Sequence, residues 1–179
     1  MRYEILIVGR GGQGVLLLGR ILGVAASKYA GLHATVTESY AAETRGGESR
    51  SDVIIASSIY EAPYIKVLNA DMAIFMFPYR VDEYKKLLKE NSIVVIDEEY
   101  VNPELFKGYK LISARFSEIA EKAIGTRRVA NIVILGRIIK ELKFVGISEE
   151  HVRRALEELV PPRWLQLNNK AFEEGLKLP

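Results

Sequence analysis

The N-terminal segment constrains the fold more than any other part of the chain. Residues 3–8 form a short apolar run that ends at a glycine-rich segment, Gly9-Arg10-Gly11-Gly12-Gln13-Gly14. Apolar residues at helical spacing then follow over residues 15–30, and Gly31 ends that pattern. This order predicts a strand, a tight turn and a helix, which is how many α/β domains begin.

Strand and helix patterns continue to alternate along the rest of the chain. Strands are expected at residues 32–38, 52–56, 71–77, 92–96 and 110–113, and helices at 79–90, 116–123, 129–142, 149–160 and 165–176. Pro63 should begin a short helical turn, and Ser148 is a candidate N-cap. The alternation predicts an open, mostly parallel sheet with helices on both faces, a Rossmann-like α/β fold with a helical C-terminal portion. The first two strands should form a right-handed βαβ unit.

Length and composition limit the possible classes of protein. A chain of 179 residues, 49% hydrophobic and 27% charged, is expected to fold as a single domain spanning residues 1–179. The net charge of +2, with acidic and basic residues mixed, argues against nucleic acid as a partner. Because no apolar run reaches about 20 residues, and the glycines interrupt any signal-peptide pattern, we expect no membrane span and a cytoplasmic protein.

The residues that usually hold metals are scarce. The chain has no cysteine, which excludes disulfides and any cysteine-ligated zinc or iron–sulfur site within this polypeptide. His33 and His151 are its two histidines, and they are far apart in the sequence. We therefore expect no metal site and no histidine-based catalytic group in this chain.

The glycine segment has the G-x-G-x-x-G spacing, directly after a strand and before a helix. In that context the glycines allow a tight turn, and the helix N-terminus offers free N–H groups to an anion. This makes Gly11, Gly12, Gln13 and Gly14 candidate cofactor-binding residues. Glu38, at the end of the next expected strand, lies where a dinucleotide fold places its ribose-binding acid.

A charged, glycine-rich stretch at residues 39–51 is the second candidate site. It is expected to be a loop, and loops of this length within a domain are often functional. Its candidate binding residues are Tyr40, Glu43, Arg45, Gly46 and Gly47. The charges nearly cancel, so the stretch can equally be a solvated loop of ion pairs.

Together these motifs resemble the gamma subunit of 2-oxoacid:ferredoxin oxidoreductases, which act on pyruvate, 2-oxoglutarate or ketoisovalerate. The resemblance extends over nearly the whole chain, in the family's order. It rests on Gly9-Arg10-Gly11-Gly12-Gln13-Gly14-Val15, Ser39-Tyr40 with Glu43 and Arg45-Gly46-Gly47, Ser51-Asp52-Val53-Ile54-Ile55, Asn131 with Ile134-Leu135-Gly136, and Asn169-Lys170-Ala171-Phe172 with Gly175. Ala41 departs from the glycine, and Thr44 from the larger apolar residue, that family members often carry.

The resemblance implies a function within a larger enzyme. Such enzymes convert a 2-oxoacid and coenzyme A to acyl-CoA and CO2 and reduce ferredoxin, using thiamine diphosphate, Mg²⁺ and [4Fe-4S] clusters. The resemblance assigns these cofactors to the assembled complex and gives the chain alpha, beta and delta subunits as partners, with ferredoxin reached through them. The isolated chain is then not expected to be catalytic. Its glycine turn and charged loop should share the carboxyl edge of the sheet, support the thiamine-binding subunits and shape the access of coenzyme A.

Three alternatives remain open on the sequence. The small subunit of indolepyruvate oxidoreductases shares the glycine turn but has a histidine-containing loop where this chain has Tyr40 and Thr44. The glycine spacing by itself would also suit a free-standing NAD- or flavin-dependent oxidoreductase. The third is an interaction module without an attached enzyme, because the helix at 129–142 is apolar on nearly every side and is buried either in its own core or against a partner.

Overall fold

A central sheet organises the computed structural model, which describes residues 1–42, 46–61 and 65–179. Within these residues the sheet has six strands in the order β2-β3-β1-β4-β5-β6. The strands are β1 (Arg2–Arg10), β2 (His33–Tyr40), β3 (Glu48–Ala56), β4 (Ala70–Phe75), β5 (Leu88–Asp97) and β6 (Lys110–Ala114). The pairs β1–β4, β4–β5 and β5–β6 are parallel, so the expected α/β fold with a mostly parallel sheet is confirmed.

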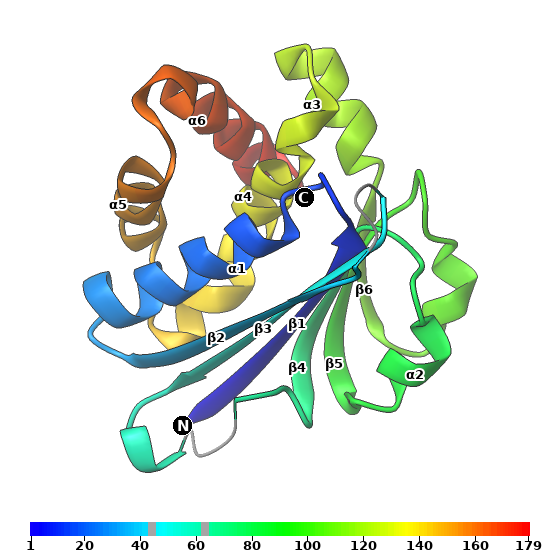
Figure 1. Cartoon of the computed structure of the whole chain (residues 1–179), viewed down its shortest axis with the longest axis vertical. Coiled ribbons are helices and arrows are strands. Elements are labelled where there is room, and N and C mark those ends of the chain that lie inside the picture. Colours follow the sequence, from blue (N-terminus) through cyan, green and yellow to red (C-terminus); the bar gives the residue numbers. More distant parts are fainter. Residues whose placement is uncertain (43–45, 62–64) are drawn as a thin grey trace.

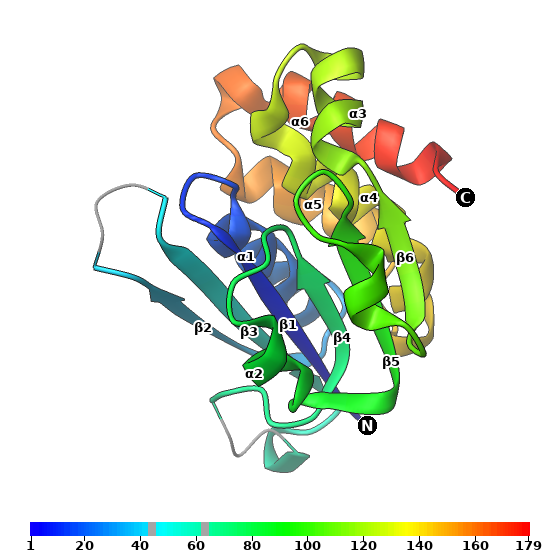
Figure 2. The ribbon, with the colours of Figure 1, turned by 90° about the vertical axis from the view of Figure 1, so that its right-hand side faces the viewer.

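Helices cover the two faces of the sheet unequally (Figures 1 and 2). The α-helices are α1 (Val15–Val24), α2 (Val81–Lys85), α3 (Phe116–Ile124), α4 (Ala130–Leu142), α5 (Glu149–Leu159) and α6 (Pro162–Lys177). Short helical turns lie at η1 (Ala25–Tyr29), η2 (Ile59–Glu61), η3 (Pro103–Phe106), η4 (Arg127–Val129) and η5 (Lys143–Val145). A large apolar core joins the sheet to α1 and the C-terminal helices, and a smaller one lies under α2 and η3 on the opposite face.

The first two strands are not neighbours, which corrects the prediction of a simple βαβ unit. β3 lies between β1 and β2 and is antiparallel to both. The polar residues 48–51, expected in a loop, belong to β3. The charged side chains among them can lie in a strand because they are paired: Arg50 donates from Nε to Asp52 Oδ1 at 2.6 Å and from Nη2 to Asp52 Oδ2 at 2.7 Å.

The helix expected at residues 79–90 is much shorter in the structure. α2 covers only Val81–Lys85, and β5 already begins at Leu88. The chain leaves the helix because it pairs with β4 instead: Ala70 N donates to Leu87 O at 2.7 Å, and Ala70 faces Leu88 in the sheet. The short helical turn expected to begin at Pro63 lies outside the described residues.

The C-terminal helices agree with the sequence pattern within a few residues. Ser148 caps α5 in a reciprocal arrangement: its Oγ accepts from His151 N at 3.3 Å, and His151 Nδ1 accepts from Ser148 N at 3.2 Å. The apolar helix α4 is buried within this chain, against the neighbouring helices and the sheet. Helix α4 is therefore no evidence for a surface that binds a partner.

Two helices cross unusually closely in this region. α4 and α6 meet at Gly136 and Gly175, and a Cβ added at Gly175 would lie 2.8 Å from the Gly136 Cα and overlap the carbonyl oxygen of Val133. A Cβ added at Gly136 would overlap the carbonyl oxygen of Phe172. We call this contact the α4–α6 crossing, and it requires glycine on both helices.

Candidate functional site

The glycine turn, residues 11–14, connects β1 to α1 at the carboxyl edge of the parallel strands. Gly12 and Gly14 have φ values of 92° and 76°, which favour glycine. Gly14 has a second constraint, because a Cβ there would overlap the side-chain amide of Asn131, whose Nδ2 donates to Gly14 O at 3.0 Å. The first turn of helix α4 therefore contacts the glycine turn and helps to fix its backbone.

Gln13 stabilises this turn. Its Oε1 accepts from Arg10 N at 2.7 Å, and its Nε2 donates to Met76 O at 3.1 Å, just after β4. Both ends of the side-chain amide are therefore used to tie the turn to the ends of two strands. The structure gives Gln13 a positioning role, while its predicted part in cofactor binding stays a prediction.

The N-terminus of α1 leaves backbone donors open. Gly14 precedes the helix without a side-chain cap, and the first helical hydrogen bond is made by Leu18 N to Gly14 O at 3.0 Å. Among the described residues, no acceptor is found for the N–H groups of Val15, Leu16 and Leu17. These donors, with the helix dipole, make this end of α1 suited to an anion.

The second candidate segment lies against the glycine turn, as expected. Gly11 N donates to Gly47 O at 2.8 Å, which joins the turn directly to the residue before β3. The hydroxyl of Tyr79 donates to Gly46 O, and Tyr40, at the end of β2, is 74% exposed. Glu43 and Arg45 lie outside the described residues. The structure therefore brings seven of the nine candidate binding residues to one edge and does not describe the other two.

These segments enclose a groove of about 830 Å³, which we call the glycine groove. It is lined by Gly11, Gly12, Gly14, Val15, Leu16, Leu17, Tyr40, Ala41, Gly46, Gly47, Glu48, Ser49 and Arg128. Arg128 is an exposed residue of η4, and no sequence motif indicated it as a site residue. Glu48 is engaged elsewhere: its Oε1 accepts from the Tyr84 hydroxyl, and its Oε2 lies 3.7 Å from Arg80. The groove therefore combines open backbone donors with a cation.

Glu38 does not occupy the position that a dinucleotide site requires. In such a site the ribose-binding acid ends the strand next to β1, but here that neighbour is the antiparallel β3. Glu38 lies on the edge strand β2, where Arg20 Nε donates to it at 2.5 Å and Arg20 Nη2 at 2.7 Å. This geometry argues against reading the glycine spacing as an NAD or flavin site.

Aromatic and charged side chains adjoin the glycine turn at the ends of β1, β4 and β5. The Arg10 guanidinium lies 4.9 Å from the ring centroid of Phe77 and 5.7 Å from that of Tyr100. Nearby, the buried Asp97 accepts from Ser117 N at 2.9 Å and from Ser117 Oγ at 2.6 Å, and burial raises its pKa above the ordinary value. Asp97 thereby fixes the start of α3 on the end of β5.

Two further findings concern the described part of the chain as a whole. In residues 1–42, 46–61 and 65–179, no three His, Cys, Asp or Glu side chains are grouped so that they could hold a metal ion. No helix in the same residues is both long and apolar enough to cross a membrane.

Two known proteins are similar to this chain over nearly its full length. The chain is 35% identical over 180 residues to the 2-oxoglutarate synthase subunit KorC of Methanocaldococcus jannaschii, covering 99% of this chain and 94% of that protein. It is 32% identical over 194 residues to the indolepyruvate oxidoreductase subunit IorB of Archaeoglobus fulgidus, covering 98% and 94% of the two chains.

Solved structures give the same picture. The gamma subunit of a keto/oxoacid ferredoxin oxidoreductase from Geobacter sulfurreducens is 32% identical, with a TM-score of 0.78 and coverage of 98% of this chain and 96% of that one. The pyruvate oxidoreductase subunit PORC of Thermotoga maritima, at 22% identity and a TM-score of 0.76, shares the fold. The pattern of the pyruvate ferredoxin/flavodoxin oxidoreductase family matches residues 4–178. This chain therefore belongs to the pyruvate ferredoxin/flavodoxin oxidoreductase family.

Proposed function

We propose that the chain is the gamma subunit of a multi-subunit 2-oxoacid:ferredoxin oxidoreductase. The observation that carries this proposal is the end-to-end similarity to proteins that are themselves separate subunits. The chain spans 94–95% of two of the KorC relatives and 96% of the Geobacter gamma subunit. In this proposal it contributes to the conversion of a 2-oxoacid and coenzyme A to acyl-CoA and CO2, as part of an assembly with alpha, beta and delta subunits.

The cofactors of this reaction belong, in our proposal, to the partner subunits. A [4Fe-4S] cluster is held by cysteine thiolates, and this chain has no cysteine. The described residues likewise offer no acidic cluster for the Mg²⁺ that accompanies thiamine diphosphate. Thiamine diphosphate and the clusters supply decarboxylation and electron transfer in the complex. The part left to this chain is to support the assembly and to shape access to it.

The glycine groove is the surface we assign to that role. The open N–H groups of residues 15–17 and the cation of Arg128 suit a phosphate group, which coenzyme A carries at the end of its nucleotide. A distant fold relative supports coenzyme A as the molecule to test. That protein, the 2-oxoglutarate:ferredoxin oxidoreductase of Magnetococcus marinus, was solved with 2-oxoglutarate, coenzyme A and succinyl-CoA bound. It is 22% identical, with a TM-score of 0.81, and this chain matches 30% of its length.

2-Oxoglutarate and chemically related 2-oxoacids are the first candidate substrates, because several of the relatives are KorC subunits of 2-oxoglutarate synthases. The IorB relatives make an indolepyruvate oxidoreductase the second candidate. Tyr40 and Thr44, which differ from the indolepyruvate type of loop, place it second.

The test is native purification of the tagged chain from its source. We expect a thiamine-binding pair and a cluster-bearing subunit to co-purify, together with viologen reduction that depends on a 2-oxoacid and coenzyme A. Comparing 2-oxoglutarate, pyruvate, 2-oxoisovalerate and indolepyruvate identifies the substrate. Elution of the chain alone, without this activity and with NAD or flavin retained, would contradict the proposal.

A second experiment addresses the glycine groove. In the purified complex, Arg128→Gln is expected to raise the KM for coenzyme A several-fold and to leave the KM for the 2-oxoacid unchanged. Arg154→Gln on α5, away from the groove, is the matched control. An unchanged KM for coenzyme A in Arg128→Gln would remove the groove from the proposal without affecting the subunit assignment.

A further inference from the structure

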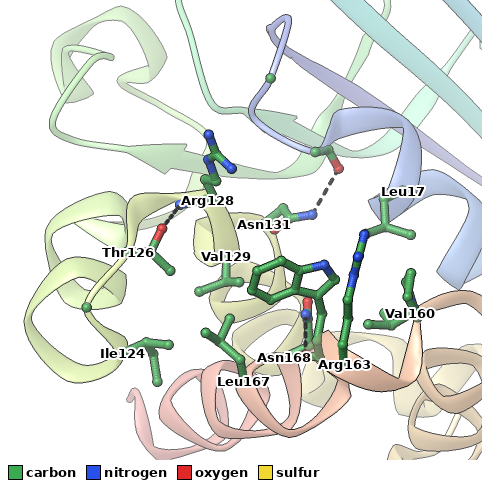
Figure 3. A pocket seen from close by; sticks show the side chains of 15 residues that line it. Leu17, Ile124, Thr126, Arg128, Val129, Asn131, Val160, Arg163, Leu167 and Asn168 are labelled. Carbon is green, nitrogen blue, oxygen red and sulfur yellow. Dashed lines mark hydrogen bonds between the residues drawn. The ribbon is translucent and has the colours of Figure 1, made fainter.

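A second cleft, of about 860 Å³, lies on the other side of the glycine turn (Figure 3). We call it the helix-end cleft. Its lining comes from four parts of the chain: the glycine turn with α1, the end of α3 with η4 and α4, the segment between α5 and α6, and the first turns of α6. A cleft of this size is within the range that holds small ligands.

Three helices begin at this cleft, and two of them, α1, preceded by Gly14, and α6, preceded by Pro161, have no side-chain cap. The third, α4, continues directly from η4, where Thr126 Oγ1 accepts from Arg128 N at 3.3 Å. By contrast, α5, which starts elsewhere, has a full capping box. An uncapped helix start carries about half a positive charge, so the two at this cleft favour an anion.

Two arginines add to this positive field. Arg128 and Arg163 are the charged residues of the lining, which contains no aspartate or glutamate. Both side chains are exposed, and neither forms an ion pair with any carboxylate in residues 1–42, 46–61 or 65–179. Most arginines elsewhere on this surface are paired, as Arg127 is with Glu99 and Glu121. The cleft therefore holds two cations that an anion can neutralise.

Asn131 is an independent indication of a ligand. It lines the cleft and is 2% exposed; its Nδ2 donates to Gly14 O, but its Oδ1 has no hydrogen-bond partner among the described residues. Only the amide nitrogen of Asn131 can donate to the Gly14 carbonyl, so the atom without a partner is the amide oxygen. A buried acceptor without a partner is unfavourable, and a donor on a bound molecule would satisfy it.

Apart from Thr126 and Asn168, the other side chains of the lining are apolar. Leu17, Val129, Val160 and Leu167 form walls, and Trp164, which is 48% exposed, adds a large flat ring. The Arg163 guanidinium lies 5.6 Å from the centre of that ring. Such walls suit a ligand that carries a flat apolar body beside its charge.

We propose that the helix-end cleft binds a small anion with a flat apolar body. The helix starts and the two arginines receive the carboxylate, phosphate or sulfonate group, Asn131 Oδ1 accepts from a donor on the ligand, and Trp164 with the leucine and valine side chains contacts its apolar part. This site is separate from the glycine groove, although Gly12, Gly14, Leu17 and Arg128 border both.

Trp164 gives a direct readout, because it is the single tryptophan of the chain. The purified full chain is titrated with 8-anilinonaphthalene-1-sulfonate, and binding is followed by quenching of the tryptophan and energy transfer to the dye. We expect saturable binding at one site, weakened about tenfold in Arg163→Gln and in Arg128→Gln through the lost charge-assisted contact. Arg154→Gln, an exposed arginine outside the cleft, should bind like the wild type.

Two measurements on the unmodified chain keep the proposal testable if a variant does not fold. The uncharged analogue N-phenyl-1-naphthylamine should bind at least about tenfold more weakly, and added salt should weaken binding of the sulfonate. Equal binding of the two dyes, non-saturable binding, or a loss in Arg154→Gln as large as in Arg163→Gln would overturn the proposal. These readouts need no partner subunit, so failure here is distinguishable from failure of the subunit assignment.

Discussion

Glycines serve opposite purposes in two regions of this molecule. In the glycine turn they keep the backbone open: nothing lies within 4 Å of where a Cβ at Gly12 would stand, and the N–H groups of residues 15–17, just after the turn, have no partner in the described structure. In the α4–α6 crossing they let two helices touch, and Gly136 and Gly175 have backbone atoms where their side chains would be. Both regions contain motifs through which the chain resembles its family, so a shared motif marks packing as readily as binding.

The largest expected effect is on the crossing. Gly175→Ala forces a Cβ into the carbonyl oxygen of Val133 and the backbone of Gly136, neither of which can rotate away. We expect a loss of about 3 kcal/mol in the free energy of unfolding, measured by urea denaturation of the isolated chain. Gly11→Ala is the matched control, because its nearest neighbour would be 3.5 Å away at Gly47 O, and it should cost little. Equal losses would show that the two regions do not differ as described.

Gly14 is constrained both by its backbone conformation and by a close packing contact, so its substitution should have the next largest effect. Gly14→Ala places a side chain at a φ of 76° and against the Asn131 amide, and we expect a loss of about 2 kcal/mol. Gly12→Ala, at a φ of 92° but in open space, carries the backbone strain alone and should cost about 1 kcal/mol. Denaturation curves of the two variants measure the difference. If Gly12→Ala is the more destabilising, Asn131 is not what makes Gly14 necessary.

Gln13→Ala tests whether the turn depends on side-chain hydrogen bonds. The change removes the bonds from Arg10 N and to Met76 O, and we expect a loss of about 1 kcal/mol in the free energy of unfolding, because the site is partly exposed and water can replace the amide. Gln13→Glu keeps the acceptor for Arg10 N but sets a carboxylate oxygen against Met76 O, and because two acceptors repel each other its loss should be at least as large. Wild-type stability in Gln13→Ala would contradict the positioning role.

The smallest effect concerns charge in the packed region. Glu141, on α4, accepts from Lys110 at 2.9 Å and from Arg137 at 3.4 Å, and the hydrogen bond from Lys110 is the main reason why its pKa is lowered from 4.5. A lowered carboxyl pKa stabilises the fold above pH 4.5, and this contribution disappears as the pH falls through the lowered value.

We therefore expect Glu141→Gln to cost about 0.5–1 kcal/mol at pH 7, discounted for the exposed Lys110, and to cost progressively less as the pH falls below 4.5. Denaturation of the wild type and the variant at pH 7 and at a series of lower pH values gives the comparison. A difference that grows toward low pH would have the wrong sign for this account.

The sequence by itself determined the elements whose signals are local. A strand, a glycine turn and a helix follow one another within residues 2–24, and Ser148 caps α5 from the residue just before it. Helix periodicity and caps depend on neighbours three or four positions away, so a linear pattern contains them. The family resemblance was likewise readable from ordered motifs and is confirmed by the match over residues 4–178.

Tertiary structure decided everything that depends on distant partners. Only strand pairing placed β3 between β1 and β2, turned the polar residues 48–51 into strand and moved Glu38 away from a dinucleotide position. The helix-end cleft exists because helices starting at Val15, Ala130 and Pro162 converge, although more than a hundred residues separate the first from the others. Hydrogen bonds between strands and the convergence of helix ends depend on the path of the whole chain, and no local pattern encodes that path.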